Sequence, residues 1–314
     1  MILVTGETIV DFIESGRSGD SRTYQAVIGG SPLNVATALA RLGRAVAFFG
    51  AISTDRFGRD VIDRLAREGV DTSLVRRTDH PAPLAFASLD DEGVAHYTFR
   101  LVGSADLSLG VDDLPETLPE SIDCLHFGSV AAAVEPSASA LVALVERYGD
   151  DRVVSFDPNV RAAVIPDRGA WLARFDALLP RLDVLKASAE DVAWIFGTDD
   201  IEAVARTWSR IGPKLAVITA GAEGAVAAVR GEVVRMPAAP VDCIDTIGAG
   251  DAFQGTLLDG IAFHGLMSKS ALAELDPVSL PSLLRPAIAV AGRVCERRGA
   301  DFPRGAEIAE LLSK

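Results

Sequence analysis

The chain has 314 residues, of which 30 are Lys or Arg and 44 are Asp or Glu, so its formal net charge is −14. This acidic balance argues against a nucleic-acid partner, because binding a phosphate backbone requires a basic surface. It argues equally against an anionic membrane surface. With 49% hydrophobic residues, the chain is too apolar for a disordered protein and long enough to bury a full core.

The three cysteines, Cys124, Cys243 and Cys295, are far apart in the sequence and form no C-x-x-C pair. This spacing is typical of buried thiols in a reducing compartment, not of a disulfide framework or a zinc site. Glu7 and Asp11 interrupt the first apolar stretch, so we expect no signal peptide. Because no uncharged apolar run reaches about 18 residues, we also expect no membrane span and place the protein in the cytoplasm.

The first hundred residues predict a strand, a helix, a second strand and a second helix, followed by a hairpin. The apolar spacing predicts strands over residues 2–12 and 45–52 and helices over 34–42 and 57–68. Residues 84–89 and 94–100 flank a polar, glycine-containing turn and predict a β-hairpin. Together with residues 9–14 and 24–28, this hairpin could form a small separate sheet.

Beyond about residue 120, predicted strands and helices alternate in one continuous unit, so we treat residues 1–314 as a single domain. We expect strands near 124–130, 152–157, 184–187 and 215–219, with helices near 137–147, 170–179 and 201–211. This alternation is typical of parallel βαβ units with helices on both faces of the sheet. Ligands of such sheets bind at the carboxyl ends of the strands, so the motifs that follow strands matter most.

The strongest motif is Asp245-Thr-Ile-Gly-Ala-Gly-Asp251, which precedes a helical stretch over residues 252–262. Its backbone at Gly248, Ala249 and Gly250 can approach a ligand closely, and the positive end of a helix adds to an anion hole there. Asp251 stands at the edge of this turn, where its carboxylate could take a proton from an attacking hydroxyl. The alternative is that Asp251 merely caps the helix.

A second motif, Gly29-Gly30-Ser31-Pro32-Leu33-Asn34, opens the helix over residues 34–42. The two glycines allow a hinge or a close approach to a ligand, and Asn34 can donate to and accept from sugar hydroxyls. An ordinary helix start explains the same residues. Asp11 ends the first predicted strand, a position where an acid is often only solvated.

Shorter motifs follow three later strands. Arg161 supplies a cation in the segment 157–161, and Ser188 and Glu190 follow the next strand, where they could simply cap it or favour the helix dipole. A glycine-rich turn contains Thr219, Gly221 and Gly224. The four histidines show no metal-ligand spacing, and Arg100 has the neighbours of a solvated surface charge.

Several enzyme classes are excluded by missing motifs. The chain has no G-x-x-x-x-G-K-[ST] phosphate loop and neither the H-R-D nor the D-F-G motif of protein kinases. It has no G-x-S-x-G nucleophile elbow, and its first strand is followed by G-E-T and not by a dinucleotide-binding fingerprint.

In order and spacing, these motifs make the chain similar to the ribokinase/PfkB family of carbohydrate kinases over almost its whole length. GGSPLNVATALARLG resembles the first signature of that family and DTIGAGDAFQGTLL the second, about 210 residues later, with Ile247 where a threonine is frequent. The segments FRLVGSADLSL, HFGSVAAAVEP, FDPNVR and LKASAEDVAWIFG resemble the fructokinase branch. In 2-keto-3-deoxygluconate kinases an aspartate is common where this chain has Ser31 or Pro32.

The resemblance implies an α/β fold, a three-layer αβα sandwich with a mostly parallel central sheet. It also implies a small β-sheet lid, built from about residues 9–28 and 84–100. The implied activity is ATP-dependent phosphorylation of a primary hydroxyl, with D-fructose as the expected acceptor. A kinase of the same family acting on 2-keto-3-deoxygluconate, ribose or a nucleoside remains open, as does a non-catalytic sugar or nucleotide sensor. Edges of the lid sheet could pair with a second copy to give a homodimer.

The resemblance also implies roles for individual residues. Asp251 matches the catalytic base, and Gly248, Ala249 and Gly250 match the anion hole. Sugar contacts are matched by Asp11, Gly30 and Asn34, to which we add Gly29, Arg100 and Arg161 as candidate substrate-binding residues. Ser188, Glu190, Thr219, Gly221 and Gly224 match nucleotide-binding positions, with Glu190 holding Mg²⁺ through water. Backbone carbonyls near Asp245, Ile247, Val294, Arg297 and Gly299 align with a loop for a monovalent cation such as K⁺.

Overall fold

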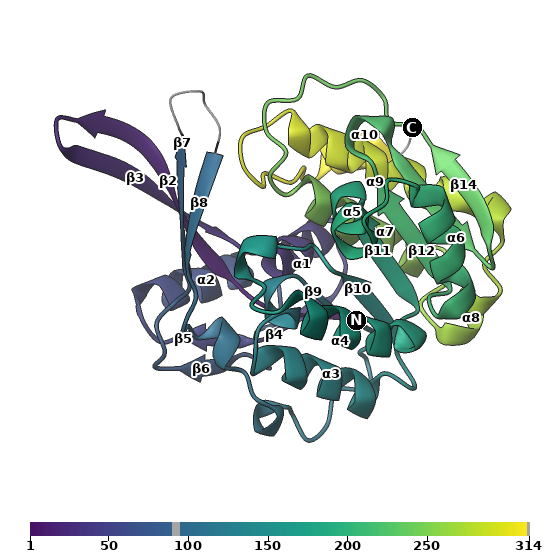
Figure 1. Ribbon diagram of the computed structural model, residues 1–314, viewed down its shortest axis with the longest axis horizontal. Helices are drawn as coiled ribbons and strands as arrows, with labels where there is room; N and C mark the ends of the chain where they lie inside the picture. Colours follow the sequence, from purple (N-terminus) through teal and green to yellow (C-terminus); the bar gives the residue numbers. More distant parts are fainter. Residues whose placement is uncertain (90–94, 313–314) are drawn as a thin grey trace.

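The structure is a computed structural model that describes residues 1–89 and 95–312. Its central feature is an eight-stranded sheet with the order β14-β13-β12-β11-β10-β9-β1-β4 (Figure 1). The strands are β1 (Ile2–Thr5), β4 (Val46–Phe49), β9 (Cys124–Gly128), β10 (Val153–Asp157), β11 (Val184–Ser188), β12 (Leu215–Thr219), β13 (Ala225–Val229) and β14 (Glu232–Met236). Pairing is parallel from β4 to β12 and antiparallel for β13 and β14, which confirms the mostly parallel sheet.

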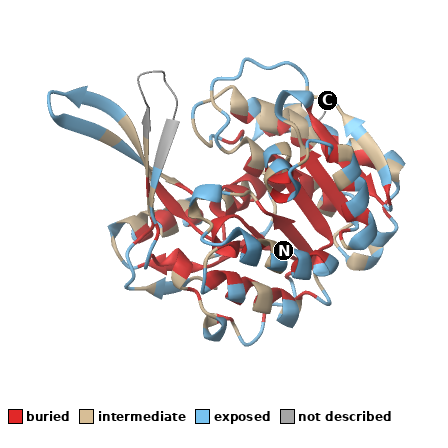
Figure 2. Cartoon of the chain, in the orientation of Figure 1, coloured by how far each residue is buried: buried red, intermediate tan, exposed pale blue. Residues whose placement is uncertain are grey.

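Helices cover both faces of this sheet because alternate strand residues point to opposite sides. Leu3 belongs to a core cluster on one face of the sheet. This cluster includes residues of α3 (Ser137–Tyr148), α4 (Arg168–Leu178), α5 (Ala189–Phe196) and α6 (Ile201–Ile211). Its neighbours Ile2 and Val4 belong to the core cluster on the other face. That cluster includes residues of α1 (Ser31–Arg41), α2 (Arg56–Arg67), α7 (Ala249–Phe263) and α9 (Leu280–Cys295). Burial is concentrated in the sheet and on the inner sides of these helices (Figure 2), so the three-layer arrangement is confirmed.

The second sheet, which we call the lid, has the order β3-β2-β7-β8 and projects from the body of the molecule (Figure 1). Its strands are β2 (Ile9–Ser18), β3 (Ser21–Gly29), β7 (Leu84–Leu89) and β8 (Ala95–Arg100). Phe12 stacks on Phe86 with ring centroids 5.1 Å apart and meets Phe57 of α2 edge-on at 5.7 Å. These aromatic contacts fix the lid to α2. The predicted hairpin turn lies outside the described residues.

Two predicted strands are each divided by a glycine, so their predicted extents were wrong. The strand expected over residues 2–12 breaks at Gly6, where φ is +147° and a Cβ would lie 2.4 Å from Pro32 Cγ. The strand expected over 45–52 breaks at Gly50, after which β5 (Ala51–Ser53) pairs with β6 (Arg76–Thr78). As a consequence, Asp11 belongs to the lid strand β2 and does not end the first strand of the main sheet.

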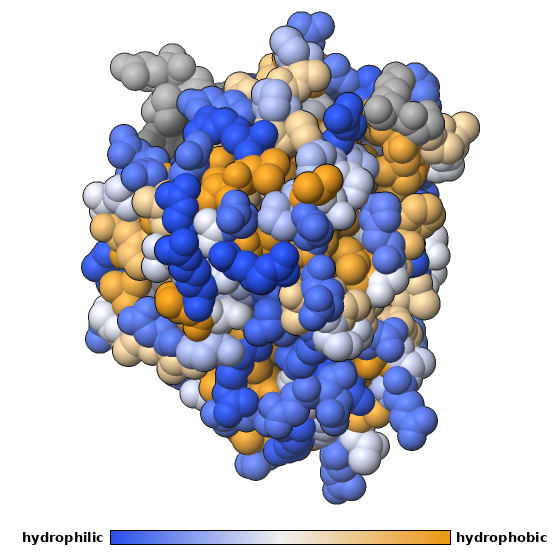
Figure 3. Space-filling view, turned by 90° about the vertical axis from the view of Figure 1, so that its right-hand side faces the viewer, coloured by the Kyte–Doolittle hydropathy of each residue, from blue (hydrophilic) through white to orange (hydrophobic). Residues whose placement is uncertain are grey.

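The remaining helices, α8 (Lys269–Ala273) and α10 (Ala306–Leu312), lie beyond α7 in the sequence. Among the described residues, the stretch Pro277–Cys295 is long and apolar enough to pass a length and composition test for a membrane span. Leu283 and Leu284 in it are buried with residues of α7, as expected of a core helix. Figure 3 shows hydrophilic side chains over most of the face turned to the viewer, with apolar ones gathered mainly above its centre.

Candidate active site

The N-terminus of α7 forms a turn that presents free backbone amides. Gly248 caps the helix with φ +81°, and a Cβ there would lie 2.6 Å from Ala300 Cβ, so the turn requires glycine. Ala249 N–H donates to the Thr246 carbonyl at 3.2 Å, whereas the N–H groups of Gly250 and Asp251 have no partner among residues 1–89 and 95–312. Two amide donors and the positive end of the helix therefore face one point, which suits an anion.

Asp251 is the third residue of α7 and does not cap it, so the capping alternative for this residue was wrong. Its side chain is 7% exposed and is held by two donors from α1. Ser31 Oγ donates to Asp251 Oδ1 at 2.6 Å, and Asn34 Nδ2 donates to Oδ2 at 2.8 Å. This close approach of α1 and α7 depends on Gly255, where a Cβ would lie 2.8 Å from Ala38 Cβ. The carboxylate is thus oriented beside the free amides.

Asn34 contributes more than the sequence predicted, because it positions Asp251. Its amide oxygen Oδ1 is buried with no hydrogen-bond partner in the described part of the chain, which leaves an acceptor for a ligand hydroxyl. Ser31 was not among the predicted site residues. The signal that could have found it is its place directly after the Gly29-Gly30 pair in the first signature.

Asp11, in the lid strand β2, lies close enough to Arg161 for their charges to interact. Burial raises the pKa of the Asp11 carboxyl to about 6, and the positive charge of Arg161 opposes this rise. A Cβ on Gly29 would lie 2.6 Å from Asp11 Oδ2, and one on Gly30, where φ is +105°, would lie 2.8 Å from the Glu7 carbonyl oxygen. Gly30 is therefore required where the chain leaving β3 passes the backbone of Glu7, whereas a side chain at Gly29 would displace the Asp11 carboxylate.

The two candidate arginines differ in their placement. Arg161 Nη1 donates to Asn159 Oδ1 at 2.8 Å, which orients the guanidinium just after β10. Arg100, at the end of β8, is exposed, and its described hydrogen bond goes to the Phe99 carbonyl at 3.2 Å. No contact among the described residues joins Arg100 to Asp11 or Asp251.

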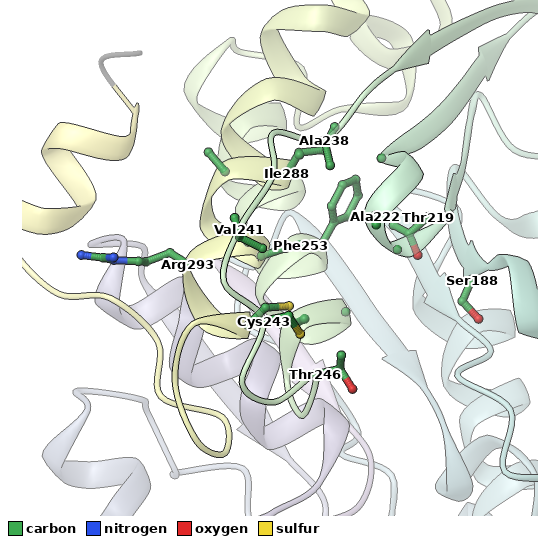
Figure 4. Close-up of a pocket in the computed structure, with 18 of the residues that line it drawn as sticks. Ser188, Thr219, Ala222, Ala238, Val241, Cys243, Thr246, Phe253, Ile288 and Arg293 are labelled. Carbon is green, nitrogen blue, oxygen red and sulfur yellow. The ribbon is translucent and has the colours of Figure 1, made fainter.

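A pocket of about 1610 Å³ lies beside the α7 N-terminus, and Arg161 is among the residues that line it. All five predicted nucleotide-binding residues line it: Ser188, Glu190, Thr219, Gly221 and Gly224. Figure 4 shows Ser188 and Thr219 on one wall and Val241 and Ile288 on the opposite one, with Phe253 between them. A polar wall facing an apolar wall suits a molecule with a phosphate chain and a flat apolar base.

Ser188 and Glu190 occupy the start of α5 in different roles. Ser188 caps the helix: its Oγ accepts from Asp191 N at 3.0 Å, while Asp191 Oδ2 accepts from Ser188 N at 2.8 Å. The structure thus confirms the alternative prediction that Ser188 caps a helix. Glu190 is exposed to the pocket, and its carboxylate has no partner among the described residues.

A metal ion fits this arrangement only if the nucleotide shares in binding it. Within residues 1–89 and 95–312 no group of three or more His, Cys, Asp or Glu side chains could hold a metal ion. Mg²⁺ keeps several waters and uses few carboxylates plus substrate phosphates, so an unpaired Glu190 in the pocket suits a water-mediated contact.

The loop predicted to bind a monovalent cation is assembled around Asp245. Its Oδ1 accepts from Ile247 N at 3.0 Å and its Oδ2 from Gly299 N at 2.8 Å, which joins the two predicted segments. The Val294 carbonyl accepts from Arg297 N at 3.0 Å, and the Arg297 guanidinium pairs with Glu307. Asp245 and Ile247 precede α7, whereas Arg297 and Gly299 follow α9. The hydrogen bond from Gly299 to Asp245 brings these two segments together, and Val294 lies in the last turn of α9.

Comparisons with known proteins agree with this site. The model of a protein family described as "pfkB family carbohydrate kinase" matches residues 1–305 of this chain. A fructokinase from Klebsiella pneumoniae is 39% identical over 281 residues, which cover 88% of this chain and 88% of that protein.

Two solved structures are also similar. The fructokinase from Xylella fastidiosa with bound ATP has a TM-score of 0.90 at 30% identity, covering 99% of this chain and 98% of that one. A double mutant of the Vibrio cholerae O395 fructokinase with fructose, ADP and potassium ion has a TM-score of 0.83 at 29% identity, covering 99% and 97%. The fold is therefore ribokinase-like and the protein is a phosphotransferase with an alcohol acceptor: the chain belongs to the pfkB family of carbohydrate kinases.

Proposed function

We propose that the protein transfers the terminal phosphoryl group of ATP to a primary hydroxyl of D-fructose. The observation that carries this proposal is the position of Asp251, a buried carboxylate held by Ser31 and Asn34 next to free amides. The nucleotide pocket adjoins it and has Arg161 in its lining, and Asp11 lies in the lid strand β2, close enough to Arg161 for their charges to interact. Fructose as the acceptor is supported by the fructokinases that this chain resembles.

In the proposed reaction, the fructose hydroxyl gives its proton to Asp251 as its oxygen attacks the phosphorus. A new oxygen–phosphorus bond forms while the bond from phosphorus to the bridging oxygen of ADP breaks. The amides of Gly250 and Asp251 stabilise the negative charge on the transferred group. The lid excludes water, which would otherwise compete as acceptor.

The proposed metal is Mg²⁺, which when bound with the nucleotide neutralises phosphate charge. Glu190 would hold it through water, since this carboxylate faces the pocket without a protein partner in the described chain. A monovalent cation, with K⁺ as the candidate, would bind beside Asp245 and Gly299, where the two loops are joined.

A coupled assay of ADP release tests the acceptor. Fructose, ribose, 2-keto-3-deoxygluconate and adenosine would be compared at saturating ATP. We expect the highest kcat/KM for fructose, and a higher value for any of the other three would reassign the substrate. Sugar binding without turnover of ATP for every acceptor would instead favour the sensor.

Two further proposals concern the setting of the enzyme. We place it in the cytoplasm, because its three cysteines are free thiols. We also retain the homodimer through the lid, whose outer strands β3 and β8 have one edge each without a strand partner in the described sheet. Light scattering of the full chain in solution measures its mass, and a mass of one chain would rule out the homodimer.

A further inference from the structure

Lys186 is a buried cation that the proposed reaction has not yet used. It lies in β11, two residues before Ser188, and is 3% exposed. Of all Lys and Arg residues in the described part of the chain, it alone is buried. Because removing an ammonium group from water costs several kcal/mol, a lysine at this position calls for an explanation.

Its partner is Asp157 at the end of β10. Lys186 Nζ donates to Asp157 Oδ2 at 2.8 Å, and the carboxylate side chain is as buried as the lysine. An ammonium group has three N–H donors, and this is the one hydrogen bond that Lys186 makes within the described residues. Two donors are therefore left over in a place from which water is largely excluded.

The surroundings of Lys186 carry excess negative charge. Burial by itself would lower the pKa of the Lys186 ammonium, but Asp157, Asp191 and Asp251 together raise it, so the group is protonated at neutral pH. Three carboxylates around one ammonium group would repel the phosphates of a nucleotide. The positive charge of Lys186 is thus what makes this end of the pocket acceptable to an anion.

Lys186 lies directly against the free amides of α7. A Cβ built on Gly250 would lie 3.2 Å from Lys186 Nζ, so no side chain separates the ammonium group from the helix N-terminus. Both residues line the 1610 Å³ pocket, together with Asp191 and Glu190. The ammonium group, the amide of Gly250 and the positive end of α7 therefore converge on one position beside Asp251.

We propose that Lys186 donates hydrogen bonds to the terminal phosphoryl group of the nucleotide and that Asp157 positions it for this contact. The proposal rests on the proposed function and adds a substrate-contacting residue to it. As the sugar oxygen bonds to phosphorus and the bridging oxygen leaves with ADP, the sugar proton goes to Asp251. Lys186 keeps its own protons and stabilises the charge on the oxygens of the group in transit.

The decisive measurement is the difference between ATP and AMP. We would compare the wild type with Lys186→Met and with the double variant Lys186→Met/Asp157→Asn, which removes both charges and so leaves no unpaired buried carboxylate at position 157. Calorimetry without sugar gives Kd for each nucleotide. We expect Kd for ATP to rise roughly 10–150-fold, the size expected for hydrogen bonds to a charged group. Kd for AMP, which lacks the terminal phosphoryl groups, should stay within about threefold.

Lys269→Met is the matched control. Lys269 also pairs with a buried aspartate, Asp183, at 2.5 Å, but this pair lies before β11 at the opposite end of the strand. Lys269→Met should leave the ratio of Kd for ATP to Kd for AMP unchanged. Equal weakening of ATP and AMP in the double variant, or an unchanged Kd for ATP, would make the Lys186–Asp157 pair purely structural and overturn the proposal.

A second measurement uses the wild type and does not depend on the variants folding. The chain has four lysines, and Lys186 is the buried one among the three that the structure describes. In ¹⁵N-lysine spectra its ammonium signal, recognised by slow exchange with solvent, should move on adding a non-hydrolysable ATP analogue and not on adding AMP. No movement with the ATP analogue would reject the contact. If the wild type binds ATP in this manner but phosphorylates no sugar, the proposed function fails and the Lys186 contact stands.

Discussion

Asp251 gains its proposed role from two neighbours on a different helix, Ser31 and Asn34, and not from its own helix. Replacing it with asparagine keeps the shape and removes the proton acceptor. We expect Asp251→Asn to lower kcat by roughly 10²–10⁴-fold, the usual contribution of a positioned general base. Kd for ATP should change little, because the anion site is made of backbone amides and Lys186. Steady-state kinetics beside Asp63→Asn, an exposed acid of α2, provide the measurement, and near-normal turnover would remove Asp251 as the base.

Asp11 should give the reaction a dependence on pH. Its pKa is raised to about 6 by burial, so the carboxylate is ionised above that pH and protonated below it. An ionised carboxylate accepts hydrogen bonds from two sugar hydroxyls, and the protonated form loses part of that capacity. We therefore expect kcat/KM for fructose to fall by up to about tenfold per pH unit below pH 6.

The same profile measured for ATP is the internal control, since we propose that Asp11 contacts the sugar and not the nucleotide. In Asp11→Asn the break near pH 6 should vanish, with a lower plateau at pH 7.5. A wild-type profile that stays flat through this range, or an identical break in the variant, would remove Asp11 from the sugar site.

Glu190 should set the demand for Mg²⁺. We expect Glu190→Gln to raise the Mg²⁺ concentration that gives half-maximal activity, because an amide is a poorer acceptor than a carboxylate for metal-bound water. Activity would be titrated with Mg²⁺ at fixed ATP, beside Glu146→Gln on the exposed side of α3. An unchanged midpoint would leave Glu190 only its favourable interaction with the helix dipole.

The sequence predicted those site residues whose signal lies in a short motif, such as Asp251 and Asn34. Ser31 and Lys186 escaped because a serine at a helix start and a lysine after a strand are ordinary in any α/β protein. Their roles come from the packing of α1 against α7 and of β11 beside β10, which brings together residues far apart in the chain.

At the scale of elements, α7 has a left-handed glycine near each end. Gly248 begins it with φ +81° and Gly265 follows its end with φ +71°. A Cβ at Gly248 would collide with Ala300 at 2.6 Å, whereas one at Gly265 would meet nothing within 4 Å. A side chain at Gly265 would cost only the left-handed backbone conformation, whereas one at Gly248 would also cost the collision with Ala300. Comparing substitutions at the two glycines therefore separates these two free-energy costs.

We expect Gly265→Ala to reduce the free energy of unfolding by about 1 kcal/mol and to leave kcat unchanged. Gly248→Ala should destabilise the fold by more than this and also lower kcat, because the collision shifts the turn that carries the free amides. Chemical denaturation and steady-state kinetics on both variants give the comparison. Equal effects of the two changes on kcat would contradict an anion site at the start of α7.

Among elements, the long periodic helices and the apolar strands of the parallel sheet were predicted closely, as for α6 (Ile201–Ile211) and β12 (Leu215–Thr219). The antiparallel pair of β13 and β14 was not predicted, because a short apolar run such as residues 225–229 does not reveal its direction. The breaks at Gly6 and Gly50 were missed for a similar reason: the apolar pattern continues across both glycines, and the bend is fixed by Pro32 and by the crossing backbones.

At the scale of the whole molecule, a buried contact joins Asp106, in the segment after the lid strand β8, to Thr8, in the connection between β1 of the main sheet and the lid strand β2. Asp106 Oδ1 accepts from Thr8 N at 2.6 Å and from Thr8 Oγ1 at 2.9 Å, just before the lid strand β2 begins. Burial raises the pKa of the Asp106 carboxyl to about 8, the bonds from Thr8 oppose this rise, and the charge of Glu7 adds to it. The folded protein therefore holds a proton that the unfolded chain, with an ordinary pKa of 3.8, releases.

Because the folded state binds more protons between about pH 4 and pH 8, the contribution of Asp106 to stability falls as pH rises through this window. We expect Asp106→Asn to raise the free energy of unfolding relative to wild type at pH 8, by roughly 1–4 kcal/mol more than at pH 5. Urea denaturation at both values tests this, with Asp112→Asn as an exposed control. A difference between variant and wild type that does not change with pH would mean that Asp106 is ionised in the folded protein.

The lid enters the chain as two excursions from the main sheet, residues 9–29 and 84–100, while α7 and the nucleotide pocket are built almost entirely from residues after 158. The proposed acceptor contacts of the lid and the proposed phosphoryl-transfer residues therefore come from different stretches of the sequence, and they meet at the contact of Ser31 and Asn34 with Asp251. We therefore expect substitutions in the lid to change the preferred acceptor while leaving the proposed phosphoryl-transfer residues in place. With the two functions carried by separate segments, acceptor specificity can change during evolution while the phosphoryl-transfer residues stay the same.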